Sequence, residues 1–338
     1  MKKTLLALVV AATAAGTVNA AEIVKSDSGT VNFYGQLRQN IVLSDADADA
    51  DAAVDWSSSR AGIDASYAIN DNLNLVGLVE FYVRGTFSAR KHYIGFESDS
   101  FGTVTFGKNS PLSDDVYGAE YSYYYGGSDG FLYNTDMAND YFWQDNMIKY
   151  ELVKDAYWVK ASYNLPEKNS APELYELFAG TSFGDLSLHA GGSVMNNYVA
   201  TTKDVYTADL TTGEVTSTEE TTVGNTKYTS YEVTAEYALG GSTLGATYAH
   251  IKTEVGSAES ESDAISLGAM VPVADKTTAY GGYQFLDIDA EDSDKTIIYA
   301  GVEYKFASWG RTYAEYGYNK TEGSDANNGV VVGARVYW

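Results

Sequence analysis

Residues 101–130 read FGTVTFGKNSPLSDDVYGAEYSYYYGGSDG and join two kinds of sequence. A short run in which apolar and polar residues alternate, 103–108, leads directly into a long acidic segment rich in tyrosine. Alternation with a period of two indicates a strand whose two faces meet different surroundings. Loops as long as the segment that follows are uncommon in compact folds and usually carry function. The stretch therefore predicts a strand followed by a loop that folds back into a barrel and narrows its interior.

The same alternation continues on both sides of this stretch, from residue 31 to the last residue. Short turns, such as 70–72 and 239–242, alternate with longer polar loops, such as 44–56, 110–143 and 199–227. The runs between them count as sixteen strands. An even strand number, with short turns at one end and long loops at the other, is typical of an outer-membrane barrel. We therefore predict an all-β fold, a 16-stranded antiparallel transmembrane β-barrel whose third extracellular loop, at about 110–143, folds inward.

A soluble secreted β-sandwich is the alternative fold. All six arginines fall on predicted strands at positions opposite the apolar face: Arg38, Arg60, Arg84, Arg90, Arg311 and Arg335. This placement suits the lumen of a barrel, because an arginine facing lipid costs about 2–4 kcal/mol at mid-membrane. It also suits the solvent face of a sandwich. The strand number favours the barrel, because the last strand, 329–338, needs a partner and closure against the first strand supplies one.

The first twenty residues predict a signal peptide at 1–20. Lys2 and Lys3 form its charged region, 5–15 its apolar region, and 18–20 a cleavage site of small residues. The apolar run is shorter than the ~20 residues that a membrane-spanning helix needs. We therefore expect an exported mature chain, residues 21–338, that forms one barrel domain in the cell outer membrane.

Composition excludes several classes of function. Removing the signal peptide takes the formal net charge from −24 to −26, which argues against nucleic acid, because its binding depends on Lys and Arg. Cysteine is absent, which excludes disulfides and thiolate chemistry. No nucleophilic-serine motif, phosphate-binding glycine loop or metal-ligand spacing is found. The acidic runs 45–55 and 287–294 lack calcium-loop spacing and are interpreted as solvated loops. We expect neither an enzyme nor a cofactor or metal.

Six segments carry a family resemblance: VNFYGQL (31–37), SSRAGID (58–64), LNLVGLVEF (73–81), ARKHYIGFESDSFGTVTFGKNSPLSDDVYG (89–118), DNMIKYE (145–151) and ARVYW (334–338). With the strand rhythm they resemble the general, non-specific trimeric porins of Gram-negative outer membranes. From 166 to 292 the resemblance rests on periodicity alone. It implies a homotrimer, in contact with outer-membrane lipid and lipopolysaccharide, that passively admits ions and small hydrophilic solutes through a water-filled pore.

The resemblance also implies a pore constriction, in which carboxylates on the third loop face basic residues on the barrel wall. Arg60 and Arg90 match two wall arginines of the family, and Glu80 matches an inward glutamate. On the loop, Tyr124 stands where the family has a glutamate, and Glu120 matches an acidic position four residues earlier. The predicted constriction comprises Arg38, Arg60, Glu80, Arg90, Asp114, Asp115, Glu120 and Tyr124.

Other positions depart from the family pattern. Gln36 replaces a lysine, Trp143 aligns with an arginine, and the second long loop, a latch between subunits in the family, is reduced to 85–88. Fewer wall cations and the negative net charge predict a preference for cations. Asp114 and Asp115 either face the pore or cap the turn of the loop, and the tyrosines of 117–125 either pack the loop or offer stacking surfaces.

Two other functions remain open. A solute-specific sugar porin would use the tyrosine loop, although a lumenal aromatic ladder would be needed to mark it. A surface adhesin would use the threonine-rich segment 199–227. A barrel enzyme would need a catalytic Asp/His or Ser/His group, and the sequence does not supply one.

Overall fold

The computed structural model describes residues 20–44, 52–55, 58–83, 88–126, 143–167, 172–208, 215–288 and 294–338. The signal peptide predicted at 1–20 lies outside the described residues, except for Ala20, and stays a prediction. Arg84 and most of the acidic run 45–55 also lie outside them. No helix in the described ranges has the length and apolar character needed to cross a membrane.

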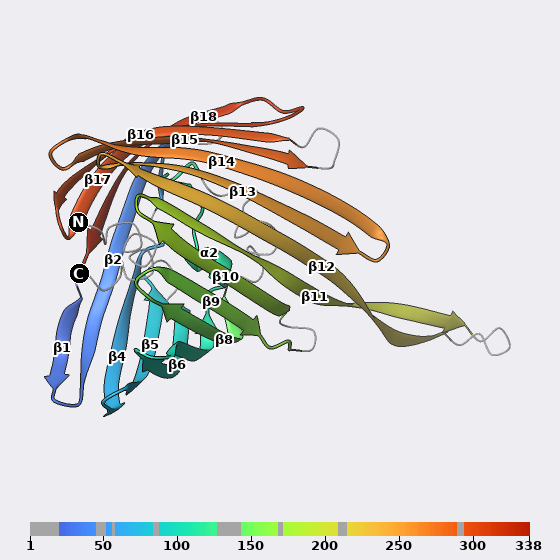
Figure 1. The fold of residues 1–338 in the computed structure, drawn as a ribbon. Helices are drawn as coiled ribbons and strands as arrows, with labels where there is room; N and C mark the ends of the chain where they lie inside the picture. The colour runs from blue at the N-terminus through green and yellow to red at the C-terminus, as the bar shows by residue number, and fades with distance from the viewer. Residues whose placement is uncertain are drawn as a thin grey trace.

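In the described ranges, eighteen strands form one antiparallel sheet, and sixteen of them pair in a closed ring (Figure 1). The ring comprises β2 (Gly29–Ser44), β4 (Arg60–Asn70), β5 (Leu73–Tyr82), β6 (Ala89–Ser98), β7 (Gly102–Asn109), β8 (Gln144–Val153), β9 (Tyr157–Asn164), β10 (Glu173–Phe183), β11 (Leu186–Ala208), β12 (Val215–Leu239), β13 (Ser242–Val255), β14 (Ala258–Ala274), β15 (Thr277–Ile288), β16 (Lys295–Ala307), β17 (Gly310–Thr321) and β18 (Asn327–Tyr337). The other two, β1 (Ala21–Ser26) and β3 (Ala53–Asp55), pair with β2. The predicted sixteen-stranded antiparallel barrel is confirmed.

Closure joins the two ends of the chain. Strand β18 pairs with β2 from Ser44 to Gln36, and Gly35 then exchanges backbone hydrogen bonds of 2.9 and 3.1 Å with Trp338. Strand β1 pairs with residues 29–33 of β2. Because β4 occupies the opposite edge of β2 over the same residues, β1 extends the edge that β18 covers. The sequence prediction began at residue 31 and missed β1, which is short and lies next to the signal peptide.

Along the strands, charged residues are buried and apolar residues are exposed, which is the reverse of the pattern in a soluble protein. On β10, Glu176 is 4% exposed while its neighbour Leu177 is 59% exposed. On β12, Glu232 is 3% exposed and Val233 is 50% exposed. A β-sandwich would bury the apolar members of these pairs. The polar interior and apolar exterior therefore decide between the two folds in favour of the barrel.

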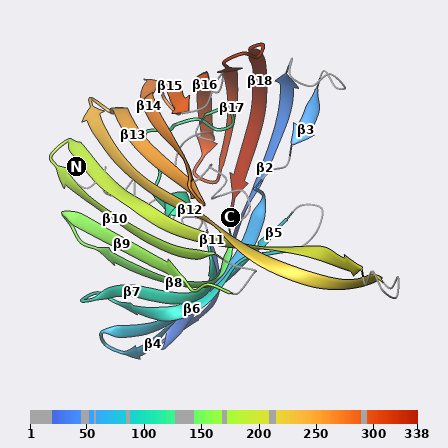
Figure 2. The ribbon, with the colours of Figure 1, turned by 90° about the vertical axis from the view of Figure 1, so that its right-hand side faces the viewer.

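One predicted loop is wrong. Residues 199–227 are mostly strand, since β11 continues to Ala208 and β12 begins at Val215. The two strands pair with each other in unbroken register as far as Ala208 and Val215, and Figures 1 and 2 show this hairpin projecting beyond the barrel. Threonine and valine, which are frequent in this segment, favour strands. The sequence also predicts a longer polar loop at 255–262, and this prediction is wrong as well, because only a two-residue turn separates β13 from β14.

Candidate pore constriction

The loop that follows β7 is anchored to the barrel wall by a small apolar cluster. It begins with the helical turn α2 (Leu112–Asp115). Leu112 and Val116 are buried against Trp158, Phe178 and Ile251, which belong to β9, β10 and β13. Apolar side chains in a polar interior need a partner to leave water, so this patch holds the start of the loop against the wall.

A wall glutamate caps the N-terminus of α2. The backbone N–H groups of Leu112 and Ser113 donate to Glu176 at 2.6 and 3.0 Å. The first amides of a helix have no hydrogen-bond partner within the helix. A carboxylate is favourable at the N-terminus because the helix dipole is positive there. The cap therefore comes from β10 rather than from Asp114 or Asp115, and both aspartates line the central cavity instead.

The middle of the loop follows the wall across β13, β14 and β16. Ala119 donates its N–H to Thr247 Oγ1 at 2.6 Å and accepts a hydrogen bond from Ser266 Oγ at 3.2 Å. Tyr121 donates its N–H to the hydroxyl of Tyr299 at 3.0 Å. Residues 127–142 lie outside the described part of the chain, so inward folding of the whole predicted loop 110–143 stays a prediction.

Glu315 of β17 holds the far end of the described loop. Its carboxylate accepts the backbone N–H groups of Tyr123 and Tyr125 at 2.7 and 2.6 Å and the hydroxyl of Ser122 at 2.7 Å. The Tyr125 ring lies so close to Gly317 that a Cβ there would come within 2.1 Å of it. The tip of the loop therefore needs both a carboxylate and a residue without a side chain on the facing strand.

The two interpretations of the tyrosine cluster apply to different members. Tyr121 donates its hydroxyl to Glu236 at 2.6 Å, and the Tyr123 ring stacks on Tyr313 with centroids 4.5 Å apart. These tyrosines pack the loop against the wall. Tyr117 and Tyr124 are 46% and 37% exposed and line the central cavity.

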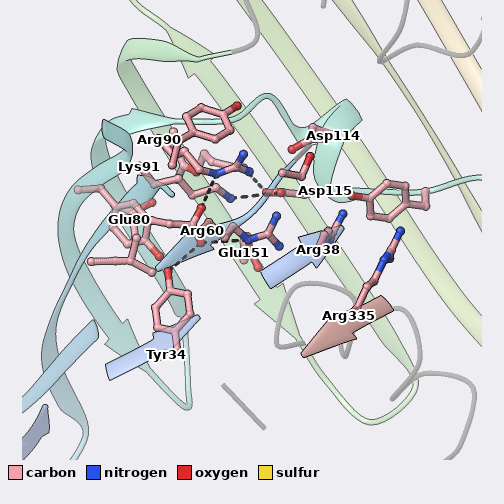
Figure 3. Close-up of a pocket in the computed structure, with 18 of the residues that line it drawn as sticks. Tyr34, Arg38, Arg60, Glu80, Arg90, Lys91, Asp114, Asp115, Glu151 and Arg335 are labelled. Atoms are coloured by element: carbon pink, nitrogen blue, oxygen red, sulfur yellow. Dashed lines mark hydrogen bonds and ion pairs between the residues drawn. The ribbon is translucent and has the colours of Figure 1, made fainter. Parts of the chain in front are cut away.

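The structure brings all eight predicted constriction residues to one cavity of about 720 Å³ between the loop and the wall (Figure 3). They are Arg38, Arg60, Glu80, Arg90, Asp114, Asp115, Glu120 and Tyr124. The arginines and Glu80 come from β2, β4, β5 and β6, and the other four come from the loop. Residues from separate parts of the sequence thus meet around one cavity.

Glu80 organises the wall side of this cavity. Arg90 Nε lies 2.8 Å from Glu80 Oε1, and Arg60 Nε lies 3.3 Å from Oε2. The Arg90 guanidinium also stands 4.4 Å from the ring centroids of both Tyr82 and Trp143. Cation–π contacts of this kind hold a guanidinium in a fixed orientation. Trp143 stands where the resemblance implied an arginine, and its ring packs against the guanidinium of Arg90.

A β-bulge turns Arg90 into the lumen. In the ladder between β5 and β6, Glu80 pairs with Lys91 and Phe81 pairs with Ala89, which leaves Arg90 without a register partner. Ile94 and Phe96, which have the same parity as Arg90, are exposed on the outside of the barrel. Simple alternation, which underlay the prediction, therefore does not place Arg90 inside. The bulge re-aims its side chain.

The three carboxylates in the described part of the loop have different electrostatic surroundings. Burial alone would raise the pKa of Asp115, but the ammonium groups of Lys149 and Lys91 hold that pKa below its usual range. Burial, together with the neighbouring Asp115, raises the pKa of Asp114 to about 6. Burial, together with Glu315, raises the pKa of Glu120 to about 8. Asp115 is thus the loop carboxylate that is ionised at every physiological pH.

Sequence reasoning missed four charged residues of the cavity: Lys91, Lys149, Glu151 and Arg335. Lys149 lies inside the barrel one residue from the outward Ile148, so alternation in segment 145–151 was a usable signal for it. Arg335 was assigned to the lumen but not to the constriction. Its place depends on β18 meeting β2, where Arg335 and Arg38 are register partners.

Comparisons with known proteins agree with the barrel fold. The family model described as "Gram-negative porin" matches residues 7–324. "Porin-like protein H" of Photobacterium profundum is 29% identical over 357 residues, covering 99% of each chain. The solved structure of OmpT from Vibrio cholerae is 39% identical, with a TM-score of 0.79 over 94% of this chain and 100% of that one. A trimer form of OmpT gives 39% identity and a TM-score of 0.77, over 92% of this chain and 100% of that one.

Proposed function

The chain belongs to the Gram-negative porin family and is a diffusion channel of the outer membrane, not an enzyme, and we propose that its pore is non-specific and prefers cations. The pore would admit ions and small hydrophilic solutes. The observation that carries this proposal is the central cavity, which is lined by side chains of both charge signs. Opposed charges across a narrow aqueous passage orient dipolar solutes and disfavour apolar ones.

In this proposal the eight residues around the cavity form the constriction. Asp114, Asp115 and Glu120 belong to the loop side, and Arg38 and Arg60 belong to the wall side. A solute that passes between the two sides crosses a transverse field. A solute in this passage would interact weakly with many charged side chains rather than strongly with one apolar pocket. Such weak, distributed contacts suit a channel that admits many solutes.

The cation preference rests on charge outside the cavity. The basic side chains that line it are Arg38, Arg60, Arg90, Lys91, Lys149 and Arg335, and the acidic ones are Glu80, Asp114, Asp115, Glu120 and Glu151. The basic side chains exceed the acidic ones by one, and the raised pKa of Glu120, about 8, lowers the negative charge of the lining further at pH 7. The chain as a whole has a formal net charge of −24, to which wall glutamates outside the cavity lining, such as Glu232 and Glu236, contribute. Their summed potential attracts cations to the pore, so we expect a modest preference.

A sugar-specific pore is the second candidate, and one observation favours it. Tyr117 and Tyr124 expose their rings in the cavity, and such rings can stack on the apolar faces of a sugar. Two rings on one loop are a single contact point rather than a ladder along the pore. The adhesin alternative stays a prediction, because the side chains of residues 198–208 and 215–223 lie outside the described part.

We further propose that the channel works as a homotrimer in contact with outer-membrane lipid and lipopolysaccharide. The trimer form of OmpT supports the oligomeric state by similarity. Apolar side chains on the outward face of the strands, such as Leu177 and Val233, suit either lipid or a neighbouring subunit. Most of the connection 85–88, which corresponds to the family's latch, lies outside the described residues.

Recordings in planar bilayers test the proposal directly. Purified mature protein should insert as stable open channels, and the reversal potential in a KCl gradient should indicate selectivity for K⁺. A series of sugars of increasing size should reduce conductance according to size alone. Saturating block by one sugar would replace the general reading with the sugar-specific one, and selectivity for Cl⁻ would refute the cation preference.

A further inference from the structure

Three arginines occupy directly opposed positions on neighbouring strands of the lumen wall. Arg311 of β17 is the register partner of Arg335 of β18, and Arg335 is the register partner of Arg38 of β2. Directly opposed side chains on an antiparallel pair have Cβ atoms roughly 4.5–5.5 Å apart, and like charges at such positions destabilise a sheet. A row of three guanidinium groups therefore needs a compensating negative charge.

Within the described part of the chain, only one end of the row has a carboxylate partner. Arg311 Nη1 lies 2.7 Å from Glu303 Oε2, whereas no ion pair involves Arg38 or Arg335. Arg38 donates its Nε to the neutral amide of Gln36 at 2.8 Å. Arg335 donates its Nη2 to the backbone carbonyl of Tyr123 at 3.0 Å. Among the described residues, these two adjacent guanidinium groups thus have only neutral hydrogen-bond partners. Glu120 is the loop carboxylate on which Arg335 acts electrostatically, and its pKa is nevertheless raised to about 8.

Aromatic rings hold Arg335 in position beside Arg38. Arg335 Cζ lies 4.3 Å from the centroid of the Tyr123 ring and 5.5 Å from that of Tyr313. Its Nε is buried and has no hydrogen-bond partner among the described groups, so the stacked guanidinium is not fully satisfied by the protein. Both arginines line the cavity, and Figure 3 shows them side by side.

We propose that Arg38 and Arg335 form a binding site for the oxyanion group of a passing solute, a carboxylate or a phosphate. The planar fork of a guanidinium matches either group and binds it through paired hydrogen bonds. An oxyanion at this place would also relieve the repulsion within the arginine row. The site rests on the proposed function, because its ligand arrives through the open pore. It would retain oxyanion-bearing solutes in a channel that otherwise favours cations.

Single-channel recording tests this site on the purified mature protein. Inorganic phosphate or succinate is added to KCl at constant ionic strength, and each is expected to lower the current in a saturating manner. The double variant Arg38→Gln/Arg335→Gln should raise the half-saturating concentration by about tenfold or more, the loss expected for one charge-assisted hydrogen bond. If phosphate has the lower half-saturating concentration, the site prefers solutes that carry a phosphate group. If succinate has the lower one, the site prefers solutes that carry a carboxylate group.

Two further variants separate a site from a general field. Arg60→Gln removes the same charge from the same cavity, but Arg60 is paired with Glu80 and lies outside the row. It should shift the reversal potential and change the half-saturating concentration by no more than about twofold, because Glu80 already compensates its charge. Arg335→Lys keeps the charge and loses the fork, so it should weaken the block.

Two results would overturn the site. One is open wild-type channels whose current shows no saturation with either oxyanion, and the other is an equal loss of block in Arg60→Gln and in the double variant. Failure of the wild-type protein to form channels would instead overturn the proposed function, so the two failures are distinguishable.

Discussion

The backbone N–H of Tyr125 donates a 2.6 Å hydrogen bond to Glu315 Oε1 and ties the far end of the described loop after β7 to strand β17. The second oxygen of the same carboxylate accepts the N–H of Tyr123 at 2.7 Å and the hydroxyl of Tyr280 at 2.9 Å. Glu315 is only 1% exposed. Hydrogen bonds to an ionised acceptor are stronger than neutral ones, so this single side chain is the main anchor of the described loop tip.

We expect Glu315→Gln to loosen the tip of the loop. Glutamine keeps the size of the side chain but offers one acceptor oxygen, so several loop donors lose their charged partner. Each lost bond to a charged group is worth about 1.5–3 kcal/mol. Single-channel recordings should show more current noise and a higher mean conductance. Glu232→Gln is the matched control, because Glu232 is a buried wall glutamate that faces His189 rather than the loop. Equal conductance in both variants would refute the anchoring role.

Charge changes around Glu80 should move ion selectivity in opposite directions. Arg60→Ala and Arg90→Ala each remove a positive charge from the cavity wall, so the reversal potential should shift toward K⁺. Glu80→Gln removes the negative charge between these arginines and should shift it toward Cl⁻. No shift in any of the three variants would place the group away from the path of the ions.

Arg90→Ala should also reduce stability more than Arg60→Ala. The Arg90 side chain is 8% exposed and packs between Tyr82 and Trp143, whereas that of Arg60 is 25% exposed. Loss of Arg90 leaves one oxygen of the buried Glu80 carboxylate without its charged partner, while Arg60 and the Tyr34 hydroxyl stay on the other oxygen. We therefore expect a decrease of about 1–3 kcal/mol in the free energy of unfolding. Urea unfolding in detergent measures the difference. A larger loss in Arg60→Ala would contradict the assignment of Arg90 as the structural member of the pair.

Selectivity should depend on pH through two loop carboxylates. A carboxyl group is neutral below its pKa and negative above it. The pKa of Asp114 is raised to about 6 and that of Glu120 to about 8, in both cases first by burial. The cavity therefore gains negative charge in two steps as the pH rises from 5 to 9, and the preference for K⁺ should increase. Glu120→Gln should abolish the upper step in the reversal potential, and a flat wild-type profile would show that neither group titrates in the path of the ions.

The projecting part of the β11–β12 hairpin should be dispensable for the channel. Beyond the pair Tyr198 and Asn225 these strands pair with each other alone. Replacing 199–224 with Asn-Gly would close the hairpin with a two-residue turn. We expect unchanged conductance and a change in the free energy of unfolding within about 0.5 kcal/mol. Loss of channel formation would show that the projection is needed for assembly.

Much of the candidate site was accessible to sequence reasoning because its signals are local. Period-two alternation identified the inward face at Arg60 and Glu80, and the resemblance placed Asp114, Asp115 and Glu120 on the loop. Alternation predicted that Arg90 faces the lumen. It does face the lumen, but the bulge between β5 and β6 turns it inward, not alternation. A bulge depends on the partner strand and leaves no local pattern.

The sequence by itself determined the closed barrel and its polar interior, because a strand records its two environments in its own residue order, whereas the eight proposed constriction residues also needed the family resemblance. Only the tertiary structure decided which wall residues hold the loop and which charges become neighbours. Glu315 meets Tyr125 across 190 residues of chain, and Arg38 meets Arg335 through the register that closes the barrel. The arginine row and the raised pKa values of the loop likewise arise from strand pairing and burial between distant segments, which no single stretch of sequence encodes.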